Sequence, residues 1–598
     1  MKAKKIILSI AVAILVFVSC DKIEFGNEFL EKEPSVDVTK DSIFRRYDLA
    51  FRYLAKGYST LPYGLNLDWG AKDNKLGMDI LEPMSDLCHT YLAWGGINQF
   101  YYNGQYSAAE ENTTSKNHAN TKYHYSKEDS WVGIRIGWTF VENANKIQNI
   151  SEEERKKLIA EAKMIIAVHY VDMYRHFGGL PWVDHAFTPD ESTVLPRQTS
   201  KETLKKIVAL IDEAKKDLPW ALTNVSSEDG RFTQASAMGL KARVLLFGAS
   251  PLFNDDIPYL QANNTSDNEL TWHGGKDPSL WGAAAAAAKE LIDAVGSSGG
   301  YALVQPLSPT TDGYRKAFQD AYYKRGNGEI LISTRARFKS GAYWATNYYF
   351  YQSAGGYGTA CPTKEYVDMF PMANGTPITD INSGYNPNRD PWKNRDPRLY
   401  ETILVNEDRF QGREAELWIG GRERTTLANN ASKTGFGLKK FLLDRDAATS
   451  IQSIVQWPYL RLAEIYLTYA EAANEAEGAP SQLAYDAVNK VRARVGLNNL
   501  PPRLSQAEFR EAVFTERALE FGFEEVRWFD IVRRKKFDIF KQQLHGVNTT
   551  RNPNGTYSYE TVALPGRFWQ NNWSPKWYLS AFPPNEVNKG SLTQNPGW

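Results

Sequence analysis

The sequence has few cysteines and no pattern typical of a metal site or a reactive nucleophile. Only Cys20, Cys88 and Cys361 occur among 598 residues, and their spacing matches no metal-binding motif. There is no nucleophile elbow, and the glycines at 355–358 lack the flanking strand and helix of a phosphate-binding loop. Metalloenzyme and nucleotide-binding functions are therefore not expected. A disulfide between Cys88 and Cys361 remains open.

The chain also lacks an excess of charge of either sign. Lys plus Arg and Asp plus Glu each total 70 residues. Loss of an N-terminal signal carrying three lysines leaves a net charge of about −3, so no nucleic-acid partner is expected. A local basic patch can still form from Arg413, Arg422 and Arg424.

Only one apolar stretch stands out, and it is too short to span a bilayer. It runs from Ile6 to Val18, whereas a transmembrane helix needs about 20 apolar residues. Lysines precede it, and Ser19 and Cys20 follow it, which is typical of a bacterial lipoprotein signal. We predict a signal peptide over 1–19, a Cys20-lipidated N-terminus and tether over 20–40, and a single domain over 41–598. Attached acyl chains would hold this domain at a membrane surface.

Helical periodicity and capping signals recur along the predicted domain. Ser151 with Glu154 and Thr199 with Glu202 have the spacing of capping boxes, and Gly178 stops the helix that Ser151 opens. His169, on the apolar stripe of that helix, is expected in the core. The section at about 296–453, rich in Gly, Asn, Pro and aromatics, is predicted to be a loop-rich insert. Helices are predicted over 42–58, 151–177, 199–218, 233–247, 280–295, 459–477, 482–495 and 505–534.

Seven short segments, in order along the chain, resemble one family. HFGGLPWV at 176–183, FPMANGTPI at 370–378 and RDPRLY at 395–400 precede the longer helical motifs at 459–478, 487–497 and 516–534, and the chain ends in SLTQNPGW. Together they resemble the SusD/RagB family of Bacteroidetes surface lipoproteins. Glu525 departs from the pattern, because the family usually has glycine at that position.

The resemblance implies a mainly α, SusD-like fold. Its antiparallel helix pairs, of tetratricopeptide-repeat type, form a scaffold with long irregular loops and few short strands. Within the motifs, Arg461, Glu464 and Glu471 are expected to pair with Arg517 or Arg527 on a neighbouring helix, in a structural role. Trp598 is expected to pin the chain end.

The resemblance also implies a non-enzymatic protein that captures a glycan at the cell exterior. It would be lipid-anchored in the outer membrane and would serve nutrient uptake and polysaccharide utilization by covering a SusC-like TonB-dependent transporter. No cofactor is implied, although some relatives hold structural calcium, for which this sequence has no loop motif. Sugar binding needs flat aromatic faces flanked by hydrogen-bonding groups.

Two regions supply that mixture among the chain's 17 tryptophans and 32 tyrosines. They run from Tyr63 to Tyr106 and from Tyr343 to Tyr357, and Trp94 and Trp344 are the best candidates. For any one aromatic residue, packing beneath a loop is the commoner role. The predicted ligand-binding residues are Trp69, Tyr91, Trp94, Asn98, Gln99, Tyr101, Trp344, Tyr348 and Tyr349.

Three other functions remain open on the sequence. A SusD/RagB-type receptor could instead take peptides or glycoconjugates. A surface glycoside hydrolase would need two carboxylates about 5–10 Å apart across the bond, which sequence spacing cannot exclude. A structural adhesin would be favoured if the protein were exposed without a transporter.

Overall fold

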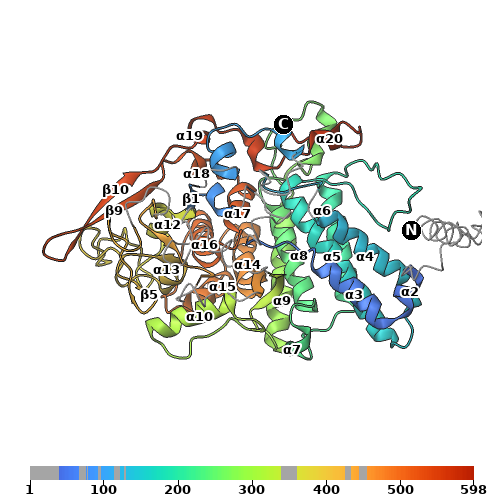
Figure 1. The fold of residues 1–598 in the computed structure, drawn as a ribbon, viewed down its shortest axis with the longest axis horizontal. Coiled ribbons are helices and arrows are strands. Elements are labelled where there is room, and N and C mark those ends of the chain that lie inside the picture. Colours follow the sequence, from blue (N-terminus) through green and yellow to red (C-terminus); the bar gives the residue numbers. More distant parts are fainter. Residues whose placement is uncertain are drawn as a thin grey trace, which may run out of the picture.

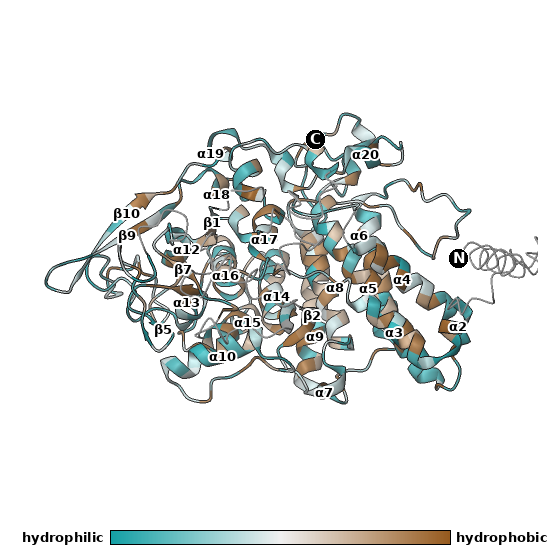
Figure 2. Cartoon of the chain, viewed as in Figure 1, coloured by the Kyte–Doolittle hydropathy of each residue, from teal (hydrophilic) through white to brown (hydrophobic). Residues whose placement is uncertain are grey.

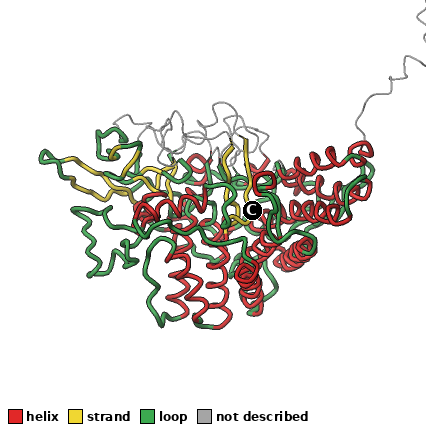
Figure 3. Tube along the Cα trace, turned by 90° about the horizontal axis from the view of Figure 1, so that it is seen from below, coloured by secondary structure: helices red, strands yellow, loops and turns green. Residues whose placement is uncertain are grey.

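The architecture is mainly α-helical, as the resemblance implied. The computed structural model describes residues 40–65, 76, 79–91, 96–112, 121–126, 129–337, 360–424, 432–442 and 454–598. No helix among these residues is both long enough and apolar enough to cross a membrane. Figure 3 shows that most strands lie at the end of the molecule opposite the first helices.

Successive helices pack side by side to form the scaffold (Figure 1). Each helix of this array contacts the next along the chain, with α7 standing apart, and α14 then packs on α8 and α9. Apolar residues run along these helices, whereas the outer loops are mostly hydrophilic (Figure 2). The array comprises α2 (Lys40–Arg45), α3 (Tyr47–Tyr58), α4 (Ser130–Asn143), α5 (Glu152–Phe177), α6 (Ser200–Lys215), α8 (Gln234–Ala249), α9 (Ser279–Ser298), α14 (Leu462–Glu477), α15 (Gln482–Ala493) and α16 (Gln506–Phe521).

Both predicted capping signals open helices. The Ser151 hydroxyl accepts a hydrogen bond from the Glu154 backbone N–H at 3.1 Å, and Thr199 does the same for Glu202 at 3.1 Å. At the end of α5, Gly178 has a φ of 78°, and a Cβ there would lie 2.7 Å from the Leu270 carbonyl oxygen. Only glycine fits this turn without strain.

His169 lies in the core, as predicted. Its Nε2 is 2.9 Å from the Thr60 hydroxyl oxygen, and burial lowers its pKa to about 4. A Cβ on Gly133 of α4 would lie 2.2 Å from this Nε2. The glycine therefore allows α4 to approach α5 closely.

Three predicted helices differ clearly from the structure. The segment 42–58 divides at Arg46 into α2 and α3. Tyr459–Arg461 belong to strand β8 (Ile454–Arg461), which pairs with β2 (Ile330–Arg337), so the helix begins only at Leu462. The segment 505–534 breaks after α16, and α17 (Arg527–Arg533) follows. Between them Phe523 and Glu525 have φ values of 63° and 58°. Glu525 thus adopts the left-handed conformation that explains the family's preference for glycine at this position.

Within the described residues, the strands form five two-stranded antiparallel pairs. In its described part, the section expected to be irregular also contains three helices that sequence patterns missed: α10 (Thr311–Tyr323), α12 (Lys364–Met369) and α13 (Pro397–Thr402). Besides β2 and β8, the pairs are β1 (Cys88–Thr90) with β3 (Ala360–Pro362), β4 (Ile403–Leu404) with β7 (Gly437–Leu438), β5 (Arg409–Phe410) with β6 (Arg413–Glu414), and β9 (His545–Arg551) with β10 (Tyr557–Ala563).

Short turns of helix complete the described chain. They are η3 (Glu82–Met84), η4 (Ile97–Tyr101), η5 (Ala108–Asn112), η6 (Ala144–Lys146), η7 (Thr265–Leu270), η9 (Pro575–Tyr578), α7 (Val225–Glu228), α18 (Asp538–Lys541), α19 (Trp569–Asn572) and α20 (Pro584–Val587). As predicted, Trp598 pins the chain end: its indole N–H donates to the Lys576 carbonyl at 3.0 Å, and its ring packs edge-on against Tyr106.

Cys88 and Cys361 are buried and unbonded to each other. In the β1–β3 ladder, Cys88 lies opposite Pro362, and Cys361 lies opposite His89. Residues directly opposite each other share a face, and neighbouring residues alternate. The two thiols therefore point to opposite faces, which disfavours a disulfide.

Candidate functional site

β1 lies within the first region predicted to bind ligand, and it pairs with β3, which follows the second region in sequence. Thr90 lies directly opposite Ala360, and opposed residues of an antiparallel pair have Cα atoms about 4.5–5.5 Å apart. Thr90 belongs to the first predicted region, and Ala360 follows the second. The first region and the residues that follow the second therefore meet at one two-stranded ladder, although they are far apart in sequence.

Five of the nine predicted ligand residues lie outside the described part of the chain and stay predictions. These are Trp69, Trp94, Trp344, Tyr348 and Tyr349. The other four, Tyr91, Asn98, Gln99 and Tyr101, lie on either side of the 92–95 gap.

Tyr91 directly follows β1 and is half-buried. Lys433 Nζ lies 4.7 Å from the centroid of the Tyr91 ring. The centroid of the His89 ring, two residues earlier in the chain, also lies 4.7 Å from the centroid of the Tyr91 ring. Burial raises the pKa of the Tyr91 phenol, so this hydroxyl stays protonated and can donate a hydrogen bond. An aromatic ring with a cation beside it therefore stands directly after β1.

Asn98, Gln99 and Tyr101 lie on η4, a single π-helical turn. Such turns are frequent at functional sites. Gln99 is exposed and Asn98 half-buried, whereas Tyr101 is 3% exposed and stacks on Tyr106 with ring centroids 4.2 Å apart. Tyr101 thus packs in the interior beneath the turn, whereas the side-chain amides of Asn98 and Gln99 are the polar groups of the turn that reach the surface.

The predicted basic patch does not form as a free surface. Arg424 is 8% exposed and donates to the Val547 carbonyl at 2.8 Å and to Asn548 Oδ1 at 2.7 Å. Arg413 pairs with the Glu423 carboxylate at 2.9 Å. Arg422 alone of the three is exposed.

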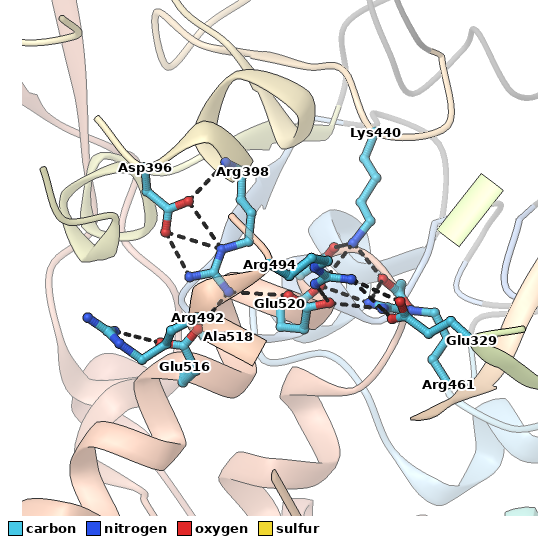
Figure 4. Close-up of polar contacts among 12 residues, drawn as sticks. Glu329, Asp396, Arg398, Lys440, Arg461, Arg492, Arg494, Glu516, Ala518 and Glu520 are labelled. Atoms are coloured by element: carbon cyan, nitrogen blue, oxygen red, sulfur yellow. Dashed lines mark hydrogen bonds and ion pairs between the residues drawn. The ribbon is translucent and has the colours of Figure 1, made fainter. Parts of the chain in front are cut away.

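The most recognisable motifs form a buried ion cluster (Figure 4). The Arg461 guanidinium lies 2.7 Å from the Glu329 carboxylate and 2.9 Å from that of Glu520, and all three side chains are fully buried. Buried ion pairs of this kind fix the register of neighbouring elements. The cluster connects β2, β8, α13, α15 and α16, and comprises Glu329, Asp396, Arg398, Lys440, Arg461, Arg492, Arg494, Glu516, Glu520 and Glu524.

Glu464 lies 3.7 Å from Arg517, as predicted, and its main partner is Arg243. The other predicted pairings are wrong. Arg461 joins the cluster described above, and Glu471 pairs with Arg533 and Arg534. Arg527 pairs with Asp86 at 2.7 Å. This last pair anchors the first predicted ligand region to α17, so the Asp86 carboxylate has a structural role.

Two further acids of the same region are buried. Burial raises the pKa values of Asp79 and Glu82 to about 8, and the nearby Glu525 carboxylate adds to the effect at Glu82. Within the described residues, no three His, Cys, Asp or Glu side chains gather as a metal site. The structure also contains a cavity of about 310 Å³ between α4, the chain after α5 and the C-terminal segment, which sequence patterns missed.

Known proteins resemble this chain over most of its length. The model of the SusD family matches residues 330–598. SusD-like protein P38 of Formosa agariphila is 25% identical over 422 residues, which are 66% of this chain and 69% of that protein. A SusD-like protein from Bacteroides fragilis has the same fold, with a TM-score of 0.72 and 23% identity over 95% of this chain and all of that one.

Two other solved structures have names that state a ligand. A SusD-like carbohydrate-binding protein from Bacteroides fragilis matches with a TM-score of 0.66 and 21% identity, covering 92% of this chain and 99% of its own. A laminarin-binding SusD-like protein matches with a TM-score of 0.60 and 18% identity, covering 93% and 100%. The predicted resemblance to the SusD family and the predicted fold are both confirmed.

Proposed function

Because this chain is SusD-like, we propose that it is a cell-surface lipoprotein that captures an oligosaccharide or polysaccharide. Cys20 anchors it in the outer membrane, facing the exterior, and it passes the glycan to a SusC-like TonB-dependent transporter. It acts by binding, without catalysis and without a cofactor. The carbohydrate and laminarin ligands named for two structural relatives support the choice of a glycan.

The observation that carries this proposal is the β1–β3 ladder. It pairs a strand of the first aromatic-rich region with the residues that follow the second in sequence, and Tyr91, with Lys433 over its ring, directly follows this strand. A sugar ring can stack on an aromatic face while amide and cationic groups bond its hydroxyls. Trp94 and Trp344 would supply the main stacking faces.

Affinity gels containing candidate glycans test the site. Trp94→Ala and Trp344→Ala should each abolish retention of a glycan that slows the wild-type protein. Trp220→Ala is the matched control, since this residue lies outside both regions and donates to the Gly299 carbonyl at 2.9 Å. Unchanged retention of both loop variants would remove these residues from the site.

Separate experiments test which ligand the protein binds and whether it associates with a transporter. A glycan array beside a peptide library separates a glycan receptor from a peptide receptor, and new reducing ends after incubation would reveal a hydrolase. Pull-down after mild detergent extraction should recover a TonB-dependent transporter. Recovery of the protein alone would favour an adhesin.

A further inference from the structure

The cavity beside α4 combines flat aromatic walls with polar groups. It measures about 310 Å³, at the lower end of the range of about 300–1,000 Å³ for small-molecule sites. Tyr125, Trp131 and Phe187 contribute aromatic walls, and Ser126, Arg135 and Glu586 contribute polar groups. This volume suits one sugar residue better than a long chain.

Two residues on one face of α4 hydrogen-bond to the chain after α5, which forms one wall of the cavity. The Trp138 indole N–H donates to the Val183 carbonyl at 2.9 Å, and the Glu142 carboxylate accepts from the Ala186 N–H at 2.7 Å. The Tyr170 hydroxyl also accepts from the Val183 N–H at 2.8 Å. These contacts fix the wall before any ligand arrives.

Arg197 fixes the wall formed by the C-terminal segment. Its guanidinium donates to the Gly179 carbonyl at 2.8 Å, to the Thr593 carbonyl at 2.7 Å and to Asn595 Oδ1 at 2.9 Å. It also lies over the Phe582 ring, 4.6 Å from the centroid. Because one buried cation ties both chain segments together, the cavity is preformed, which lowers the entropic cost of binding.

Arg135 is a charged side chain of this cavity that pairs with no other group among the described residues. It is exposed and lies one helical turn after Trp131, so the two side chains share a face of α4. Within the described part of the chain its guanidinium makes no hydrogen bond or ion pair. Other charged groups of the lining are already paired: Ser126 Oγ donates to Glu586 Oε1 at 3.3 Å, and Lys589 lies 2.7 Å from that carboxylate. His185, also in the lining, lies 2.8 Å from the Asp184 carboxylate.

We infer that this cavity binds a sugar residue that carries a carboxylate, such as a hexuronic acid. The sugar ring packs on the aromatic walls, the carboxylate takes the fork of the Arg135 guanidinium, and the Glu586 carboxylate accepts from sugar hydroxyls. This site lies apart from Tyr91 and the β1–β3 ladder in its residues. The inference goes beyond the proposed function, because it needs neither the two aromatic regions nor a transporter.

Isothermal titration of the detergent-solubilised full-length protein tests the inference, with D-glucuronate as probe. Its uncharged methyl ester and D-glucose are the matched neutral ligands. A charge-assisted hydrogen bond is worth enough that both neutral ligands should bind about tenfold more weakly or worse. Equal affinity for glucuronate and its methyl ester, or no saturable binding of glucuronate, would overturn the inference.

Three variants locate the binding. Arg135→Gln should weaken glucuronate about tenfold or more, whereas Arg135→Lys should retain part of the affinity because it keeps the charge. Arg52→Gln, on an exposed arginine of α3 outside the cavity, should bind like wild type. Wild-type affinity in Arg135→Gln would contradict the site. Trp94→Ala should lose the oligosaccharide and keep glucuronate, so failure of one site is distinguishable from failure of the other.

Discussion

At the scale of single residues, Glu471 shows how the buried charges depend on one another. Its carboxylate lies 2.6 Å from the Arg533 guanidinium and 2.7 Å from that of Arg534, and its own side chain is 3% exposed. Burial alone would raise its pKa, but these cations lower it well below the ordinary range. The carboxylate is therefore charged in the folded protein and compensates two cations.

Glu471→Gln should destabilise the fold by about 1.5–3 kcal/mol, because it removes the charge from buried hydrogen bonds to two guanidinium groups. Arg533 keeps Asp530 and Arg534 keeps Glu475 as partners, so neither cation is left without a counter-charge. Denaturant unfolding followed by fluorescence measures the change. Glu153→Gln, at an exposed position of α5, is the control and should stay within about 0.5 kcal/mol of wild type. A loss below about 1 kcal/mol in Glu471→Gln would contradict this role.

Residue patterns recovered some of these roles and missed others. His169 was predicted to be a core residue because it lies on an apolar helical stripe, and it is one. The partners of Arg461, Glu471 and Arg527 could not be predicted, because they come from segments distant in sequence, as Asp86 does for Arg527. Ion pairs of this range depend on how the elements dock.

At the scale of elements, the β1–β3 ladder decides whether two distant regions can share one ligand. Each strand has three residues, and their order along the chain suggests no pairing. Helix boundaries are more local, since Ser151, Thr199 and Gly178 act on the backbone within one turn.

A designed disulfide tests the register of this ladder. Thr90→Cys with Ala360→Cys, in a Cys88→Ser and Cys361→Ser background, should form a disulfide under mild oxidation. The two positions are directly opposite, at a Cα separation of about 4.5–5.5 Å that suits the bond. Mass spectrometry of non-reduced peptides detects it.

The native cysteines provide the matched control, because Cys88 and Cys361 point to opposite faces and should remain reduced under the same oxidation. A one-residue shift of the ladder that brings Cys88 opposite Cys361 would reverse both results, with the native pair forming the bond and the designed pair remaining free.

At the scale of the whole molecule, two sets of buried carboxylates respond oppositely to pH. Burial raises the pKa values of Asp79 and Glu82 to about 8, so the folded state holds protons that the unfolded state releases above its lower pKa values. Their contribution to stability is present at acid pH and is lost as the pH rises toward 8. Glu464 responds in the opposite sense. Burial alone would raise its pKa, but the Arg243 guanidinium outweighs this effect and lowers the pKa to about 2. The contribution of Glu464 to stability is therefore lost as the pH falls below about 4.5.

Asp79→Asn with Glu82→Gln should therefore gain stability relative to wild type as the pH rises from about 5 to 8. Melting temperatures of both proteins across this range measure the difference. The acid limb below pH 4.5 should be the same in both, because Glu464 is unchanged. A difference independent of pH would show that these two groups do not titrate in this range.

Membrane attachment is also a property of the whole chain. Cys20→Ala should abolish incorporation of labelled palmitate and move the protein from the membrane fraction to the periplasmic fraction, because the thiol is the proposed site of acylation. Cys361→Ser, at a buried position, should keep both labelling and fractionation. Membrane retention of Cys20→Ala would mean that another contact holds the protein.

The sequence by itself determined most of the helical scaffold and the SusD resemblance, because periodicity, capping and motifs act over short stretches of chain. It missed α4, which the structure adds to the scaffold. Only the tertiary structure decided that Tyr459–Arg461 form a strand with β2, that Thr90 meets Ala360, and that Arg135 faces a preformed cavity. Each of these depends on segments that are remote in sequence and come together through packing, which no local pattern encodes.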